Sequence, residues 1–277
     1  YVVNGGMEKD KIPRRLAKNL DEADFVVGNS GHVSDLVARR IKRPVATIHD
    51  AADRRFFYPP QDVQKSHAPV VLYAGSFRPW KRVPFVVEQA ALWPAIEFRI
   101  AGMGEDEAEC RRLARERSCS NVTFLGHLSP AKLGDEMRKA DIFFFPSVLE
   151  GNPQVLVQAA ACGLPCVAMQ CYRSDFVHHG HSGLLARSDD ELSAYLKLLI
   201  TDSDLRQIMS LAAIEHVAQF DWDKITCRWA DVFERAVEKR LGLRGRATAT
   251  RFCKTRETDA ASAGLLVPNV PERWPRS

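Results

Sequence analysis

Groups able to bind a ligand fall close together between residues 150 and 158. Glu150 supplies a carboxylate just before a predicted helix, and Gln158 supplies an amide inside it, on the same face as Gln154. The first N–H groups of a helix, here those of Gln154 and Val155, have no partner within the helix and attract anions. This pattern suits a negatively charged ligand that carries a sugar. Many helix N-termini bind nothing, so a purely structural cap is the alternative.

The helix that positions these groups has clear start and stop signals. Asn152 is a residue type that caps helices, and Pro153 suits the first helical position, where its missing N–H costs no hydrogen bond. Gly163 ends the segment, and a proline two residues later prevents its continuation. The spacing predicts a helix over residues 153–162, directly after a strand that ends at Phe145.

Two further loops carry compatible residues. Gly75 allows a tight exit from a predicted strand, and Arg78 and Lys81 then place two cations on the loop. A guanidinium and an ammonium there could neutralise a diphosphate, whereas the alternative is a solvated basic turn. The loop that begins Gly102-Met103-Gly104 adds a weak glycine signal, because a lone G-x-G pattern is usually structural.

The elements that must hold these loops alternate from residue 70 onward. Short, almost continuously apolar runs are typical of strands buried on both faces, and amphipathic helical segments separate them. We therefore expect an α/β fold with a Rossmann-like, doubly wound parallel sheet. The predicted strands are 70–74, 96–101, 122–125, 142–145, 166–169 and 184–186, and the predicted helices are 83–93, 105–117, 130–139, 153–162, 189–200, 203–218 and 223–240.

Residues 1–69 fit only about two strand–helix units, with helices near 8–20 and 32–41 and strands at 25–28 and 45–49. Two strands cannot form a complete doubly wound layer, so we expect a partial first domain plus a linker. Residues 70–240 form the predicted complete domain. Residues 241–277 lack a sustained period and are predicted to be a disordered tail. The chain opens at Tyr1 without an initiator Met or a secretory leader, which suggests missing upstream sequence.

Charge and cysteine content exclude several classes of protein. The formal net charge of +4 arises in the tail, where residues 239–277 carry nine basic and three acidic side chains. The preceding part is slightly acidic, so no basic stripe predicts a nucleic-acid partner. The seven cysteines form no C-x-x-C pair, which argues against a disulfide framework and favours a reducing, cytoplasmic location.

Other small patterns favour structural roles. His178, His179 and His181 lack the Cys or carboxylate spacing of a zinc site, so no metal is predicted. The D-x-D patterns that begin at Asp202 and Asp221 fall among the late helices, where the first is expected to cap a helix. Cys162 and Cys166 are expected to be small buried residues, and Trp229, Val232, Phe233 and Val237 to belong to a packing helix.

From about residue 23 to residue 241, the chain resembles the later part of a retaining glycosyltransferase of the GT-B type, family 4. Several landmarks occur in the order in which that family has them. They are residues 23–30, 48–59, 75–81, 100–104, 122–126, 140–147 and 150–165. The resemblance implies that residues 70–240 bind a nucleotide-diphosphate sugar and that residues 1–69 belong to the acceptor side.

The resemblance also implies a mechanism that needs neither metal nor cofactor. Arg78 and Lys81 would stabilise the departing diphosphate, Gln154 and Val155 would hold phosphate oxygens, and Glu150 would contact the transferred sugar, whose anomeric configuration is retained. Leu128 would lie beside the nucleobase. The remaining expected donor-binding residues are Gly75, Ser76, Gly102, Gly151, Asn152 and Gln158.

The sequence departs from the family pattern in three places. Gln158 stands where relatives carry a second glutamate that binds ribose hydroxyls, which predicts weaker donor binding because an amide accepts less strongly than a carboxylate. Ser76 stands where many relatives carry arginine, so Arg78 is expected to substitute. The catalytic-site histidine belongs to the absent front of the acceptor domain, and His49 is not in its position.

We therefore expect sugar transfer to an acceptor of unknown class, which could be a glycan, a lipid or a small molecule. Peripheral membrane contact would come through the missing N-terminal part. Two alternatives remain open on the sequence. One is an inactive nucleotide-sugar-binding remnant, and the other is a GT-B epimerase that rearranges its nucleotide sugar.

Overall fold

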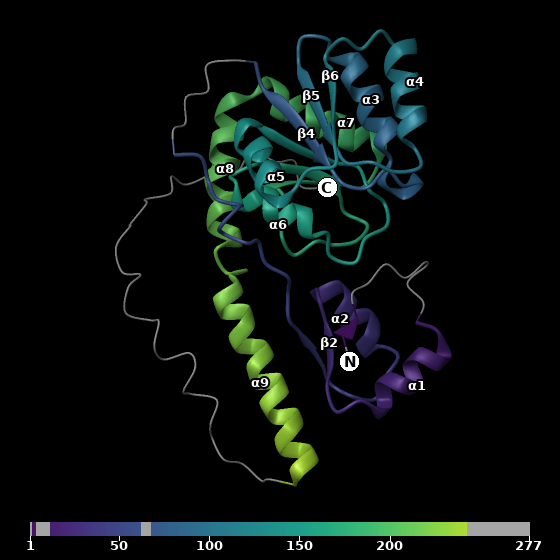
Figure 1. Cartoon of the computed structure of the whole chain (residues 1–277), viewed down its shortest axis with the longest axis vertical. Coiled ribbons are helices and arrows are strands. Elements are labelled where there is room, and N and C mark those ends of the chain that lie inside the picture. The colour runs from purple at the N-terminus through teal and green to yellow at the C-terminus, as the bar shows by residue number, and fades with distance from the viewer. Residues whose placement is uncertain (1, 4–11, 62–67, 243–277) are drawn as a thin grey trace.

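The computed structural model describes residues 2–3, 12–61 and 68–242 and contains two parallel sheets, each with its own helices (Figure 1). Three earlier expectations lie partly or wholly outside the described residues. These are the first part of the helix at 8–20, part of the linker, and the disordered tail.

The larger sheet has six parallel strands in the order β6-β5-β4-β7-β8-β9. The chain therefore builds outward from β4 to β6, crosses back, and continues from β7 on the other side. The strands are β4 (Val70–Ala74), β5 (Glu97–Ala101), β6 (Val122–Gly126), β7 (Ile142–Phe145), β8 (Cys166–Met169) and β9 (Gly183–Ala186). All six were predicted to within one residue, and the predicted doubly wound α/β fold is confirmed.

Helices cover both faces of this sheet, with α5 and α6 in front of the strands and α7 behind them in Figure 1. The helices are α3 (Val83–Leu92), α4 (Glu107–Glu116), α5 (Pro130–Lys139), α6 (Gln154–Ala161), α7 (Asp189–Thr201), α8 (Ser203–Val217) and α9 (Trp222–Leu241), with a short 3-10 helix η2 at Pro79–Lys81. Because helices shield both faces, every residue of β4, β7, β8 and β9 is buried.

The smaller unit has the sheet order β1-β2-β3, from β1 (Val2–Val3), β2 (Val26–Gly28) and β3 (Val45–Thr47). Its helices are α1 (Arg14–Glu22) and α2 (Gly31–Ala38). The prediction of two strands here was wrong, because β1 spans two residues and its pairing with β2 leaves no periodic signal. Helix α1 begins only after Pro13, which lacks the N–H that an interior position would use.

Helix α9 leaves the larger unit and runs alongside the smaller one (Figure 1). Near its end, Lys239 and Arg240 pair with Asp24 at 3.1 and 2.6 Å. The prediction of a packing helix is wrong for two of its four residues, because Phe233 and Val237 are 61% and 56% exposed. In the described part of the chain, no helix is both long and apolar enough to cross a membrane.

The cysteines of the described residues are mostly isolated thiols. Cys162 and Cys166 are buried as expected, and burial raises the pKa of the Cys162 thiol to about 12. Asp202 caps α8 as predicted, by accepting a hydrogen bond from the N–H of Leu205.

Burial in the central strands predicts that substituting two different phenylalanines will change the free energy of unfolding by very different amounts. Phe143→Ala, in fully buried β7, should lower the free energy of unfolding by about 3–5 kcal/mol, because it leaves a cavity in a close-packed core. Phe233→Ala, on the exposed face of α9, should change it by less than about 0.5 kcal/mol. Urea denaturation measures both. Equal effects would contradict this account of the core.

Candidate functional site

A cavity of about 560 Å³ opens at the carboxyl ends of the central strands of the larger sheet. It lies where the strand order reverses between β4 and β7, which is the usual ligand position in open α/β sheets. The lining residues come from the ends of two strands, from the loops after four neighbouring strands, from α5 and from the first turns of α6. They are Ala74, Gly75, Ser76, Lys81, Ala101, Gly102, Met103, His127, Leu128, Leu133, Glu150, Gly151, Asn152, Pro153, Gln154, Val155 and Gln158.

Eleven of the twelve residues singled out in the sequence line this cavity, and Arg78 does not. Arg78 instead faces Glu105 at 3.5 Å, with both side chains 53% exposed. The side chain before it, that of Phe77, is buried in the core, which leaves Arg78 at the surface. The structure thus does not bring Arg78 into the position in which it was expected to replace the arginine that Ser76 lacks.

The charges of the cavity are concentrated in one ion pair. The Nζ of Lys81 lies 2.5 Å from an Oε1 of Glu150, and both side chains are mostly buried. Ser147 donates a hydrogen bond to the same Glu150 oxygen at 2.5 Å, and the ammonium of Lys81 also lies 5.1 Å from the ring centre of Phe145. This pair joins the loop after β4 to the loop after β7.

Burial and the Glu150 charge together set the protonation of two nearby phenols. Burial raises the pKa of Tyr73 and Tyr172, and the negative charge of Glu150 raises both further. Both phenols therefore stay neutral. The hydroxyl of Tyr73 donates to the carbonyl of Ser76 at 3.1 Å, which fixes the turn that follows β4.

The backbones of two loops meet at Gly102. A Cβ at this position would lie 1.8 Å from the carbonyl oxygen of Gly75, and the φ of +132° is one that other residues rarely adopt. The Gly102 N–H donates to the carbonyl of Gly126 at 2.7 Å, so the ends of β5 and β6 are joined as well. The Gly102-Met103-Gly104 pattern, which was weak evidence in the sequence, thus marks a position where the backbones of two loops lie too close together for a side chain.

The N-terminus of α6 faces the cavity. The helix begins at Gln154 and no side chain caps it, so the N–H groups of Gln154 and Val155 are available to a ligand. The prediction that Asn152 is the cap was wrong. Its Nδ2 instead donates to the main-chain carbonyl of Asn29 at 2.7 Å, because the loop before α6 packs against the smaller unit.

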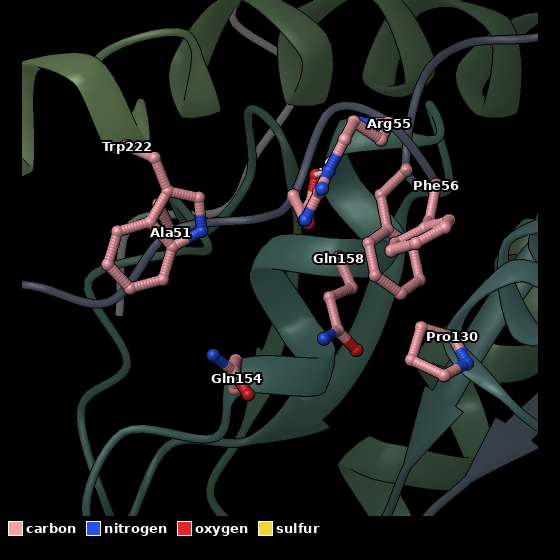
Figure 2. A pocket seen from close by; sticks show the side chains of 9 residues that line it. Ala51, Arg55, Phe56, Pro130, Gln154, Gln158 and Trp222 are labelled. Carbon is pink, nitrogen blue, oxygen red and sulfur yellow. Dashed lines mark hydrogen bonds and ion pairs between the residues drawn. The ribbon is translucent and has the colours of Figure 1, made fainter.

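A second cavity, of about 510 Å³, adjoins the first and shares Gln154 and Gln158 with it. Figure 2 shows Gln154 and Gln158 on α6 with the other labelled side chains of the second cavity around them, among them Arg55, Phe56, Pro130 and Trp222. Gln158 therefore lies between the first cavity and a more aromatic recess formed largely by the chain segment after β3.

The sequence reasoning missed six lining residues, among them His127 and Leu133. The available signal was topological, because both follow β6, whose end lies beside those of β5 and β4. His178, His179 and His181 are not part of the cavity. Within the described ranges, no group of three or more His, Cys, Asp or Glu residues is arranged to hold a metal ion.

This sheet order, with a cavity at its reversal point, is that of a Rossmann-like α/β domain, and the fold matches solved GT-B glycosyltransferases. Anabaena HepE in complex with UDP superposes with a TM-score of 0.75 at 19% identity, over 85% of this chain and 71% of that one. TarM of S. aureus, in complex with UDP and other ligands, gives 0.73 at 15% identity, over 84% of this chain and 50% of that one.

Residues 55–216 match the family model "Glycosyl transferases group 1", and the chain belongs to this family. Curated relatives include D-inositol 3-phosphate glycosyltransferases. That of Mycobacterium marinum is 28% identical over 92% of this chain and 56% of its own length. That of Catenulispora acidiphila is 29% identical over 82% of this chain and 60% of its own length. The chain thus spans somewhat more than half the length of these relatives.

Substitutions at the two members of the Lys81–Glu150 ion pair should have opposite effects on UDP affinity. If a diphosphate binds at Lys81, Glu150→Gln removes the carboxylate that would compete with it, so UDP affinity should rise by roughly three- to tenfold. Lys81→Met keeps the chain length but loses the cation, and should lower affinity by at least about tenfold. Isothermal titration calorimetry measures both changes.

Arg78→Met is the matched control, because it removes from the same loop a cation that does not line the cavity. It should change UDP affinity by less than about twofold, as an exposed charge does. A loss equal to that of Lys81→Met would contradict the site as described.

Proposed function

We propose that this chain carries the donor site of a retaining glycosyltransferase, which transfers a hexose from a nucleotide-diphosphate sugar to an acceptor. The observation that carries the proposal is the combination, in one cavity, of a mostly buried cation, a carboxylate and an uncapped helix N-terminus. The cation and the helix N-terminus suit the negative charge of a diphosphate. The carboxylate suits the hydroxyl groups of a sugar attached to that diphosphate.

The diphosphate is assigned to the start of α6. The N–H groups of Gln154 and Val155 bind its oxygens, and Lys81 neutralises the charge that develops as the bond to the sugar breaks. This arrangement requires no metal. Binding separates Lys81 from Glu150, because the phosphate oxygens take the place of the carboxylate at the ammonium.

The sugar and the nucleoside extend in opposite directions from the diphosphate. Glu150, once released, accepts hydrogen bonds from the sugar. The acceptor hydroxyl bonds to the anomeric carbon on the face from which the diphosphate leaves, and its proton passes to the departing phosphate oxygen, so the configuration is retained. Gln158 contacts the ribose, and Leu128 the base. Gly75, Ser76, Gly102 and Gly151 allow close approach of the ligand to the backbone.

UDP is the first nucleotide to test, because HepE and TarM were both solved with it. The relatives' names suggest a phosphorylated cyclitol as an acceptor to try. The acceptor side of this chain consists of the small unit described above.

A second candidate function is nucleotide-sugar binding without transfer. Two observations favour it. Gln158 stands in place of a glutamate that would bind the ribose more strongly, and Arg78 lies outside the cavity, so that it adds no positive charge to that of Lys81.

Calorimetric titration with UDP, GDP and ADP, followed by a turnover assay with the sugar of whichever nucleotide binds, separates these candidates. The proposal predicts binding of one nucleotide and release of it only when an acceptor is present. Binding without release favours the second candidate, and the absence of binding to any nucleotide contradicts both.

Gln158→Glu should tighten binding of the donor nucleotide by about three- to tenfold. The reason is that a carboxylate forms charge-assisted hydrogen bonds with ribose hydroxyls, whereas the amide forms neutral ones. Calorimetry against the 2′,3′-dideoxynucleotide is the control, because without the hydroxyls the substitution should confer no gain. An equal gain for both nucleotides would show that Gln158 does not face the ribose.

A further inference from the structure

The loop that carries Glu150 is attached to both structural units. On one side, Lys81 and Ser147 hold the Glu150 carboxylate within the larger unit. On the other side, Asn152 donates to the main-chain carbonyl of Asn29 at 2.7 Å, across 123 residues of sequence. We call residues 150–153 the donor loop.

Asn29 belongs to the turn between β2 and α2, so the smaller unit forms one wall of the donor loop. In the same turn, the hydroxyl of Ser30 lies 3.5 Å from the carbonyl of Gly151. The two contacts fall on consecutive residues of both segments. The turn and the donor loop therefore lie side by side, and together they form what we call the seam.

A second contact between the units lies outside the donor cavity. The carboxylate of Asp175 accepts a hydrogen bond from the N–H of Gly31 at 2.7 Å and lies 3.0 Å from the Nε2 of His49. Although burial alone would raise the pKa of Asp175, these two partners hold it below its usual range. Asp175 thus fixes the start of α2 against the larger unit.

The seam is incompletely paired. The Oδ1 atoms of Asn29 and Asn152 are both buried and have no hydrogen-bond partner among the described residues. Beside Asn29, burial raises the pKa of the Asp50 carboxyl, which its contact with the Asn29 amide at 3.4 Å only partly offsets. Buried polar groups without partners disfavour the closed contact, since water would satisfy them on opening. Such a contact is suited to forming and breaking.

We propose that Asn152 is a positioning residue that couples the donor loop to the smaller unit. Its side-chain N–H holds the loop and the start of α6 in their binding conformation when the seam is closed. When the seam opens, that restraint is lost and the donor cavity loosens. The predicted effect on nucleotide affinity rests on the proposed donor site. The coupling between the loop and the smaller unit is a property of the ligand-free chain.

The test compares hydrogen exchange at the α6 amides of residues 156–160 in the ligand-free, full chain. Asn152→Leu keeps the side-chain size and removes one hydrogen bond, because the Oδ1 has no partner to lose. Asp175→Ala loosens the seam at a point that does not line the donor cavity. Both variants should speed exchange at α6 by roughly five- to tenfold, the effect of about one hydrogen bond.

Asn121→Leu is the matched control. The Nδ2 of Asn121 also bonds main-chain carbonyls, those of Ala90, Trp93 and Ile96, but all of them lie within the larger unit. It should lower the stability of that unit, which urea denaturation measures, and speed exchange at α6 by no more than that loss of stability accounts for, whereas the seam variants should speed it by about five- to tenfold beyond their own loss. Acceleration equal to that of the seam variants would overturn the proposal, as would unchanged exchange in both seam variants.

Calorimetry with UDP separates this proposal from the proposed function. If the parent chain binds UDP, both seam variants should bind it about five- to tenfold more weakly, and unchanged affinity in Asp175→Ala would overturn the coupling. If the parent chain binds no nucleotide, the donor-site proposal fails, and the exchange result alone decides whether Asn152 couples the two units.

Discussion

The contact between Lys81 and Glu150 joins the two loops on which the site is built. These loops follow β4 and β7, the strands on either side of the point where the sheet order reverses. A mostly buried cation needs a partner, and in the ligand-free chain that partner is the carboxylate. A bound diphosphate offers more negative charge in the same place. We propose that the pair keeps the cavity ordered without a ligand and releases both functional groups when a diphosphate binds.

The arrangement explains why the neighbouring features have the residues they have. Gly102 brings the ends of β5 and β6 against the turn after β4, which closes one side of the cavity. The donor loop closes the other side, and the smaller unit holds that loop through Asn152. The larger unit thus supplies most of the cavity. This agrees with the match to the glycosyl transferases group 1 family and with the GT-B fold.

The sequence was most informative where local chemistry and packing agree. The buried strands and the helices between them follow from continuous apolar runs bounded by glycine and proline, and eleven expected residues gather in one cavity for that reason. The errors occurred where tertiary contacts decide. Arg78 turns outward because Phe77 is needed in the core, Asn152 bonds another unit instead of capping α6, and β1 is too short to leave a pattern. None of these outcomes is encoded in the spacing of neighbouring residues.

A crystal structure of the chain with UDP tests the account most directly. The account predicts diphosphate oxygens within hydrogen-bond distance of the N–H groups of Gln154 and Val155. It also predicts that Nζ of Lys81 moves from Glu150 to the diphosphate. UDP bound elsewhere, or bound in the cavity with Lys81 and Glu150 still paired at 2.5 Å, would contradict it.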